Sequence, residues 1–399
     1  MKIAMMTNNY KPFIAGVPIS IERLSEGLRA AGHEAVVFAP DYKEQKEEEN
    51  VIRYHSFMKG ILNGVSVPDS LDAKIEKEFK EGEFDLIHVH HPMLIGRTAL
   101  RLSKKYNVPL CFTYHTRYEQ YLHYIKAPFL ARFVPYYVKE YISQCDMVFA
   151  PTPLMQEYIE ETGGAVSCEV LPTGLEDESF ITDSHEAQRL RKELLGGKKY
   201  LFCTVARLAK EKNVDFLFRA LAMRKREQGS DFRLAVVGDG PYKMQLLKLA
   251  EELHIQEEII FVGKVPNGQI KNYCKAADLF LFASLSETQG IVLLEAMAAG
   301  TPVLAVRASG VCDVVVNGKN GYMTYLSEIE YCNKLDSMLK QDRAYMERGA
   351  VETARKYEAK EVARAAAVYY NLAIQNHKQE KDKNTGRSRK WRVAGFSLK

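Results

Sequence analysis

The 399-residue chain has no uninterrupted apolar run of about 18 residues, so none of its segments is expected to cross a bilayer. Its seven cysteines are scattered and form no Cys-x-x-Cys pair, which argues against a zinc ribbon or a disulfide framework. It also lacks an Asp-x-Asp pair placed to hold a divalent cation, and Met1 leads into a strand-like run instead of a signal peptide. These absences predict a cytoplasmic protein with reduced thiols and no bound metal.

Positive charge is concentrated near the C-terminal end of the sequence. The whole chain has a net charge of +4. Residues 376–399 contain eight Lys or Arg and two acidic residues, Glu380 and Asp382, so the net charge of this stretch is +6. The same stretch contains the only tryptophan, Trp391. A basic segment with aromatic side chains suits an anionic membrane surface. A solvated, disordered end that binds nucleic acid is the alternative.

Apolar strand-like runs alternate with amphipathic helical patterns in both halves of the chain, for example strands at 3–6 and 200–205. This alternation predicts an α/β fold with parallel sheets covered on both faces. Because 399 residues exceed what one core usually serves, two domains are expected. The expected boundaries are a first domain at 1–175, a linker at 176–197, a second domain at 198–360, a helix at 361–377 that returns to the first domain, and a basic tail at 378–399.

Two carboxylates, Glu287 and Glu295, stand eight positions apart. Gly290 separates a polar loop from an apolar helical run, so the amides of residues 290–292 are expected at a helix N-terminus, where unpaired N–H groups bind phosphate. Glu295 can accept hydrogen bonds from the paired hydroxyls of a ribose. Together these features predict a nucleotide-sugar site. Two solvated glutamates on a surface helix are the alternative, which the apolar neighbours of Glu295 disfavour.

Several polar side chains follow predicted strands, where doubly wound sheets bind their ligands. Arg207 and Lys212 lie beyond the first strand of the second half and can supply fixed positive charge to a departing pyrophosphate without a metal. The alternative is that Arg207 and Lys212 are solvated charges of a surface loop without a function. His115 ends a strand of the first half, and His88 and His90 end another. Strand alternation directs His88 and His90 to one side, so they are interpreted as cleft or supporting groups and not as metal ligands.

The motifs of the chain, in their order and separations, resemble those of the retaining glycosyltransferases of family four over roughly residues 1–375. They comprise Glu287 with Glu295, Arg207 with Lys212, and the stretches 237–241, 263–266, 277–278 and 317–321. The resemblance implies the GT-B fold, in which two Rossmann-like doubly wound domains face a central cleft. It makes the first domain the acceptor and membrane side and the second the nucleotide-sugar side.

Within this family the chain is most similar to the branch that glucosylates diacylglycerol. The stretches that carry this similarity are 12–18, 115–121, 172–174 and 287–290. Gln289 stands where many members of the family have Phe, a departure shared with that branch. Ala15 replaces a common second Gly, while Gly16 still permits close approach of a phosphate or sugar.

The resemblance also implies roles for individual residues. The residues expected to be catalytic are His115, Arg207, Lys212 and Glu287. Those expected to bind the donor are Gly16, Val265, Gly290, Ile291, Val292 and Glu295. For His115 the alternative is that of a packed structural histidine. The expected reaction moves a hexose, glucose from UDP-glucose, onto diacylglycerol with retention and without a cofactor. Front-face transfer is favoured over a double displacement with Glu287 as the nucleophile.

Aromatic and basic side chains interleave at 117–142, as in segments that lie in the headgroup layer of a membrane. The residues expected to contact acceptor or membrane are Arg117, Tyr118, Glu119, Tyr121, Lys126, Arg132 and Lys139. A buried aromatic core helix is the alternative for this stretch. With the basic tail, the stretch predicts peripheral association with the cytoplasmic face of an anionic membrane and no nucleic-acid partner.

The sequence is also compatible with other functions. The same fold can act on phosphatidylinositol, a polyprenyl lipid or a soluble sugar, or as a sugar-nucleotide epimerase. A non-enzymatic membrane- or nucleic-acid-binding protein is disfavoured because Arg207, Lys212, Glu287 and Glu295 are all present.

Overall fold

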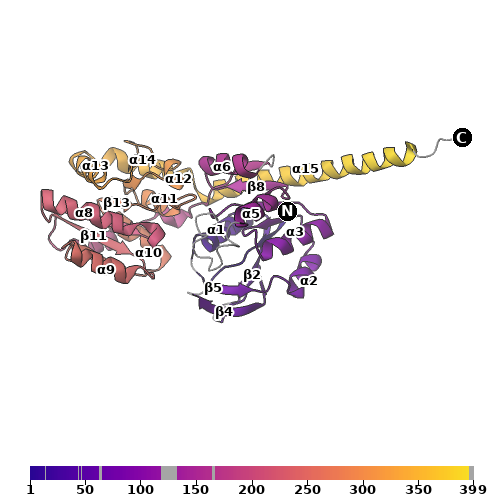
Figure 1. Cartoon of the computed structure of the whole chain (residues 1–399), viewed down its shortest axis with the longest axis horizontal. Coiled ribbons are helices and arrows are strands. Elements are labelled where there is room, and N and C mark those ends of the chain that lie inside the picture. The colour runs from indigo at the N-terminus through magenta and orange to yellow at the C-terminus, as the bar shows by residue number, and fades with distance from the viewer. Residues whose placement is uncertain are drawn as a thin grey trace. The chain divides into compact units, whose positions relative to one another are not determined.

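The computed structural model describes residues 1–13, 15–43, 45, 47–62, 65–117, 133–163 and 167–394. Of 58–62, 65–66, 163 and 380–394 only the backbone is described. The chain divides into two compact units (Figure 1). Unit 1 comprises Met1–Pro172 and the chain from Lys360 onward, and unit 2 comprises Thr173–Ala359. The predicted linker at 176–197 therefore belongs to unit 2, in which it forms η2 (Asp177–Phe180) and α7 (Ser184–Leu195).

Unit 1 contains a seven-stranded parallel sheet with the order β3-β2-β1-β6-β7-β8-β9. Its strands are β1 (Lys2–Met6), β2 (Glu34–Pro40), β3 (Val51–Tyr54), β6 (Leu86–Val89), β7 (Leu110–Thr113), β8 (Met147–Ala150) and β9 (Cys168–Val170). A separate antiparallel pair is formed by β4 (Ser56–Leu62) and β5 (Val65–Pro68). The helices of unit 1 are α1 (Gly16–Ala30), α2 (Ala73–Gly82), α3 (Ile95–Tyr106), α5 (Val134–Ile142), α6 (Pro153–Gly163) and α15 (Ala359–Ala394).

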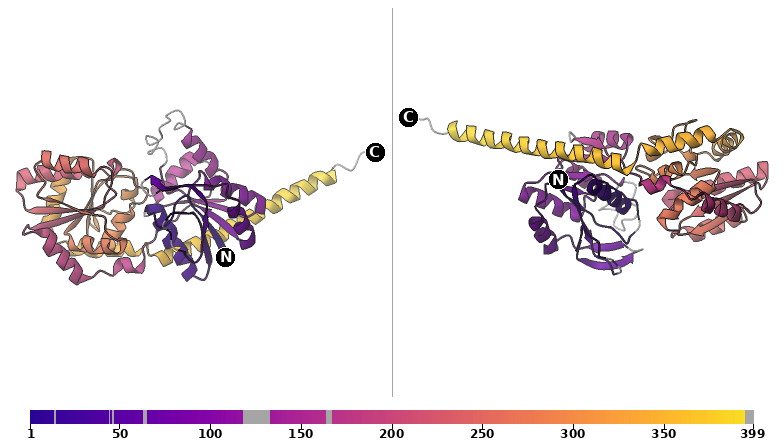
Figure 2. Two further views of the ribbon diagram at one scale, coloured as in Figure 1. Left: turned by 90° about the horizontal axis from the view of Figure 1, so that it is seen from below. Right: turned by 180° about the vertical axis from the view of Figure 1, so that it is seen from behind.

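Helices cover both faces of this sheet because successive side chains of a strand point to opposite faces. Ile3 and Met5 of β1 pack with α1 and α15, whereas Ala4 and Met6 pack with α2, α3 and α5. Helix α15 joins the core through an apolar stripe at helical spacing, formed by Val362, Ala363, Ala366, Tyr370 and Ala373. Figure 2 shows α15 lying along unit 1 and running on beyond its sheet.

Unit 2 contains a six-stranded parallel sheet with the order β12-β11-β10-β13-β14-β15. Its strands are β10 (Tyr200–Val205), β11 (Phe232–Val237), β12 (Ile259–Gly263), β13 (Leu279–Phe282), β14 (Val303–Val306) and β15 (Gly321–Thr324). Besides α7, its helices are α8 (Val214–Gln228), α9 (Lys243–Glu252), α10 (Asn267–Ala276), α11 (Ile291–Ala298), α12 (Ser309–Cys312), α13 (Glu328–Lys340) and α14 (Ala344–Arg355). A short 3-10 helix, η3 (Lys210–Lys212), follows β10.

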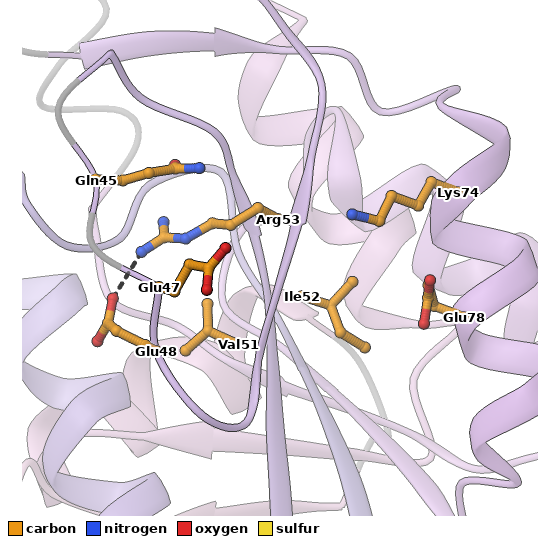
Figure 3. Close-up of a pocket in the computed structure, with 8 residues that line it drawn as sticks. All are labelled: Gln45, Glu47, Glu48, Val51, Ile52, Arg53, Lys74 and Glu78. Carbon is orange, nitrogen blue, oxygen red and sulfur yellow. Dashed lines mark hydrogen bonds and ion pairs between the residues drawn. The ribbon is translucent and has the colours of Figure 1, made fainter.

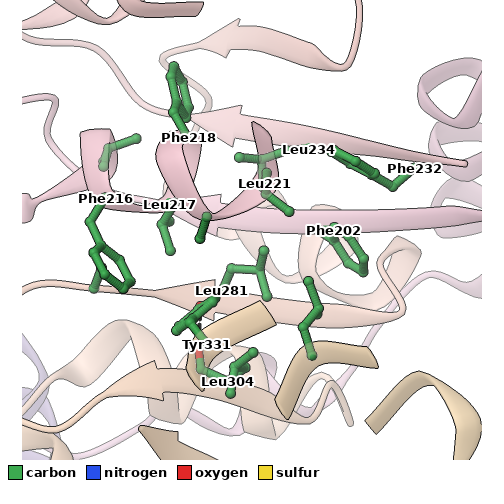
Figure 4. Packing of buried hydrophobic residues seen from close by; sticks show 14 of the residues in the cluster. Phe202, Phe216, Leu217, Phe218, Leu221, Phe232, Leu234, Leu281, Leu304 and Tyr331 are labelled. Atoms are coloured by element: carbon green, nitrogen blue, oxygen red, sulfur yellow. Dashed lines mark hydrogen bonds between the residues drawn. The ribbon is translucent and has the colours of Figure 1, made fainter. Parts of the chain in front are cut away.

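The core of unit 2 also has two layers. On one face, Phe202 of β10 packs with Phe216 of α8 and Tyr331 of α13 (Figure 4). On the other, Cys203 packs with residues of α11 and α14. The predicted α/β fold with two doubly wound parallel sheets is thus confirmed.

The strand order reverses beside the first strand of each unit, between β1 and β6 in unit 1 and between β10 and β13 in unit 2. Ligands of doubly wound sheets bind at this reversal, beyond the carboxyl ends of the strands. Topology therefore points to the loops after β1, β6, β10 and β13.

Candidate active site

The two loops at the reversal of unit 2 meet through an ion pair between Lys212 and Glu287. Lys212 ends η3, which follows β10, and Glu287 lies in the loop after β13. The Lys212 Nζ donates to Glu287 Oε1 over 2.5 Å, and both side chains are only about one-fifth exposed. Two residues that are both predicted to be catalytic are therefore in contact, 75 positions apart in the sequence.

Arg207 belongs to the same loop but not to this pair. Its guanidinium donates to Glu211 Oε1 over 2.6 Å, and its side chain is largely exposed whereas that of Glu211 is nearly buried. Glu211 was not among the predicted residues, although a carboxylate four positions after Arg207 is a visible signal for such a pair. Both predicted cations of the site thus have a carboxylate partner, Glu287 for Lys212 and Glu211 for Arg207.

The loop that carries Glu287 is fixed from its backbone by the segment that begins α12. Ser309 Oγ and the Gly310 amide both donate to the Glu287 carbonyl, over 3.0 and 3.1 Å. A Cβ on Gly310 would lie 2.7 Å from the Gln289 nitrogen, so only glycine permits this approach. Neither Ser309 nor Gly310 was predicted, and glycine after a strand was the available signal.

The expected helix N-terminus is present at α11. Gly290 caps the helix with a φ of +69°, a left-handed conformation that favours glycine. Ile291, Val292 and the predicted base-side residue Val265 pack against the same apolar cluster of unit 2. Glu295 is half-buried, and its neighbours on both sides are fully buried.

The unusual residue Gln289 has a structural partner. It is nearly buried, and its side-chain amide binds both backbone groups of Thr173. The substitution of Gln for the common Phe is thus accompanied by a specific hydrogen-bonded contact.

In unit 1, the loops after β1 and β6 meet at His91. Its Nδ1 accepts from the Asn8 amide over 3.2 Å and lies 3.2 Å from Thr7 Oγ1. Gly16 begins α1, and a Cβ built there would meet nothing within 4 Å. The space beside Gly16 is open, and its role in approach to a ligand stays a prediction.

The histidines beside this junction form an array in which His88 and His90 are buried and His91 and His115 are half-buried. His90 Nδ1 lies 2.9 Å from His115 Nε2, and His88 lies between Tyr370 and Thr113 at 2.6 and 2.7 Å. Burial lowers the pKa of His88 to about 3 and that of His91 to about 4, and it holds the pKa values of His90 and His115 well below the usual range. All four imidazoles are therefore neutral at physiological pH. Among the described residues, no three His, Cys, Asp or Glu side chains converge as metal ligands would.

Most of the predicted acceptor and membrane residues, Tyr118, Glu119, Tyr121, Lys126 and Arg132, lie outside the described residues. The Arg117 guanidinium lies 4.7 Å from the ring centroid of Tyr158.

Helix α5, at the end of the aromatic stretch, divides into two faces. Tyr137 and Tyr141 donate to backbone carbonyls of Pro92 and Gly96, as the core alternative requires. Phe133, Tyr136 and Lys139 are exposed instead. No helix in the described part of the chain is both long and apolar enough to cross a membrane.

A hollow of about 490 Å³ in unit 1 contains none of the predicted site residues (Figure 3). It lies between β3 and α2, and an Arg53–Glu48 hydrogen bond of 2.8 Å crosses one end of it. Charged side chains of both signs line it, and one of them, Glu48, forms an ion pair of 2.7 Å with Lys11 in the loop after β1.

Comparison with known proteins agrees with this geometry. Residues 14–179 match the family described as Glycosyltransferase Family 4, and residues 186–357 match that described as Glycosyl transferases group 1. The chain is 32% identical to the alpha-monoglucosyldiacylglycerol synthase of Streptococcus pneumoniae, over 76% of this chain and 71% of the relative. It is 31% identical to the synthase of the same name from Acholeplasma laidlawii, over 80% and 84%.

Among solved structures, Anabaena HepE in complex with UDP superposes with a TM-score of 0.74 at 20% identity, over 93% of this chain and 100% of that chain. This likeness supports the GT-B fold. Because the relatives are more than 30% identical over most of their length, the chain belongs to glycosyltransferase family 4.

Proposed function

We propose that this glycosyltransferase moves glucose from UDP-glucose onto diacylglycerol with retention of configuration, at the cytoplasmic face of a membrane. The observation that carries the proposal is the similarity, over most of the chain, to two proteins named as alpha-monoglucosyldiacylglycerol synthases. The Lys212–Glu287 pair supports the proposal, because it puts a cation and a carboxylate at the strand reversal, where doubly wound sheets bind their ligands.

Donor binding would use the groups gathered around α11. The pyrophosphate would draw Lys212 and Arg207 away from their carboxylates and accept hydrogen bonds from the amides at the start of α11. Glu287, released from Lys212, would accept hydrogen bonds from the sugar hydroxyls, and Glu295 from the ribose. Two fixed cations would neutralise the leaving group without a metal.

Transfer would occur on one face of the sugar. The acceptor oxygen attacks the anomeric carbon on the face from which the phosphate oxygen departs, and the acceptor proton passes to that phosphate oxygen. This route requires positioning and electrostatic stabilisation but no protein nucleophile.

The lipid acceptor would reach the site from a membrane surface beside unit 1. Phe133 and Tyr136 provide exposed aromatic rings on or beside α5, and Lys139 adds a positive charge. The basic end of the chain would add electrostatic attraction to anionic lipids.

The test incubates the purified protein with a panel of labelled nucleotide sugars and vesicles that contain diacylglycerol, phosphatidylinositol or a polyprenyl phosphate. A soluble sugar acceptor forms a parallel arm, and each reaction is run with and without excess chelator. We expect α-glucosyldiacylglycerol from UDP-glucose, with its anomeric configuration read by NMR. Product from another donor or acceptor would reassign the specificity. Isomerised donor without transfer would favour an epimerase.

A further inference from the structure

The candidate catalytic residue His115 has one neighbour that controls the position of its proton. We propose that His90 is a positioning residue that donates its Nδ1 proton to His115 Nε2 and thereby holds the His115 proton on Nδ1. The role in catalysis rests on the proposed function, whereas the proton assignment rests on the contact between the two rings and on their burial.

The contact between the two rings permits only two arrangements of protons. His90 Nδ1 and His115 Nε2 are 2.9 Å apart, so one of the two nitrogens carries the shared proton. If His115 Nε2 carried it, neutral His90 would accept at Nδ1 and would have to carry its own proton on Nε2. If His90 Nδ1 carries it, His90 Nε2 has no proton and presents only its lone pair.

The surroundings of His90 Nε2 decide between these arrangements. This atom is buried and has no hydrogen-bond partner among the residues that the structure describes, and His90 is 1% exposed. An N–H group buried without an acceptor is costly, whereas an unprotonated ring nitrogen in an apolar place loses less. His90 therefore carries its proton on Nδ1 and donates, and His115 accepts at Nε2.

Both rings are neutral, with one proton each, because burial disfavours their charged form. Desolvation holds the pKa values of His90 and His115 well below their usual range, and the neighbouring histidines lower them further. A doubly protonated ring is thus absent at neutral pH.

The His90 ring, just beyond the end of β6, packs beside the ring of His88 within that strand. The His88 and His90 ring centroids are 4.3 Å apart, and both nitrogens of His88 are engaged, one with Tyr370 and the other with Thr113. His88 is thus a buried histidine two positions before His90, and both of its nitrogens bind groups other than His115, which makes it a matched control.

The consequence for the reaction is that His115 directs a donor, its Nδ1–H, toward whatever it binds through that nitrogen. A neutral imidazole used in this way stabilises an oxygen that gains negative charge, such as that of a leaving phosphate. It does not serve as a base through that nitrogen.

The deciding measurement is a long-range proton–nitrogen NMR correlation of the ligand-free protein with ¹⁵N-labelled histidine, with a H115N variant to identify the His115 signals. We expect His115 Nδ1 in the protonated range and Nε2 in the unprotonated range. A protonated Nε2 on His115 would overturn the inference, whether or not the enzyme transfers glucose. Because no substrate is used, absence of glucosyl transfer would instead contradict the proposed function.

Variants extend the test to catalysis. In H90L we expect the His115 tautomers to mix and kcat to fall at least about tenfold with little change in the donor KM. H90N keeps an amide donor at the place of Nδ1 and should restore much of the loss. H88L should leave the His115 tautomer unchanged. If kcat of H90L equals that of the wild type, His90 has no positioning role; if H90L does not fold, the wild-type spectrum still decides the assignment.

Discussion

Gln289 closes a two-point hydrogen bond with the backbone of Thr173. Its Oε1 accepts from the Thr173 amide over 2.7 Å, and its Nε2 donates to the Thr173 carbonyl over 3.0 Å. Thr173 is the first residue of unit 2, and Leu175, two positions on, is bridged to Glu358 just before the chain leaves the unit at Ala359. The loop that carries Glu287 is therefore tied to the segment through which the chain enters and leaves unit 2.

This contact predicts a stability cost for Gln289→Leu. Leucine removes both hydrogen bonds of the nearly buried Gln289 side chain to the Thr173 backbone, which should lower the free energy of unfolding by about 1–3 kcal/mol. Urea unfolding followed by fluorescence measures the difference. Gln228→Leu, at an exposed position on α8, is the matched control and should change stability little. Equal stability of the two variants would contradict the importance of the contact.

Lys212 should be required for turnover. In Lys212→Ala the leaving group loses a fixed cation, and Glu287 loses its partner, so kcat should fall by about 10²–10³-fold. The kcat of Arg207→Ala should also fall. Lys210→Ala, an exposed lysine of the same 3-10 helix, is the control. Rates of the two site variants near that of Lys210→Ala would remove them from the proposed chemistry.

Acid should destabilise unit 1 through its buried histidines. The pKa of His88 is about 3 in the folded state against about 6.5 in an exposed chain, so below pH 6.5 the unfolded state binds more protons. Stability is thus fully present above pH 6.5 and falls toward pH 3, with a limiting slope of about 1.4 kcal/mol per pH unit for this group. Denaturant titrations at pH 7, 6 and 5 measure the fall.

The H88L variant separates this contribution from those of the carboxylates. It lacks the titrating ring, so its loss of stability between pH 7 and pH 5 should be smaller than that of the wild type. Identical slopes would show that His88 does not titrate as its burial requires.

Membrane binding should depend on two separate segments. Deletion of residues 378–399 removes most of the basic charge near the C-terminus but keeps the apolar stripe of α15, so vesicle binding should weaken while donor affinity persists. Tyr136→Ser with Lys139→Glu should weaken it as well. Sedimentation with vesicles of rising anionic content and at rising salt measures both effects. Binding that ignores anionic lipid, together with full activity on a soluble acceptor, would refute the membrane proposal.

The sequence predicted the sheets and the strand ends because buried parallel strands appear as continuous apolar runs. It also indicated Lys212 and Glu287, whose positions after β10 and β13 follow from the doubly wound order. The segment predicted as a linker contains α7, which has visible signals: Asp183 caps its first turn, and Ala187, Leu190 and Leu194 form its buried stripe. These signals were outweighed by the polar composition of the segment.

Other contacts could not be predicted from a single sequence. Gln289 and Thr173 are 116 positions apart, and nothing local in either stretch specifies the partner. The pairing of His90 with His115 likewise depends on which strands are neighbours and on how the rings pack. The backing of Glu287 by Ser309 and Gly310 depends on the close approach of two loops. Such contacts follow from tertiary packing, which overrides local pattern.

The apolar stripe of α15 has a consequence for biosynthesis. The first 172 residues emerge from the ribosome long before Val362 to Ala373 are synthesised. During that interval one apolar face of the unit 1 sheet is incompletely covered. Unit 2 is continuous and can finish folding during that interval. A nascent or recombinant fragment that stops at Pro172 should therefore aggregate or recruit a chaperone, whereas residues 173–359 should form a fragment that is expressed and purified alone.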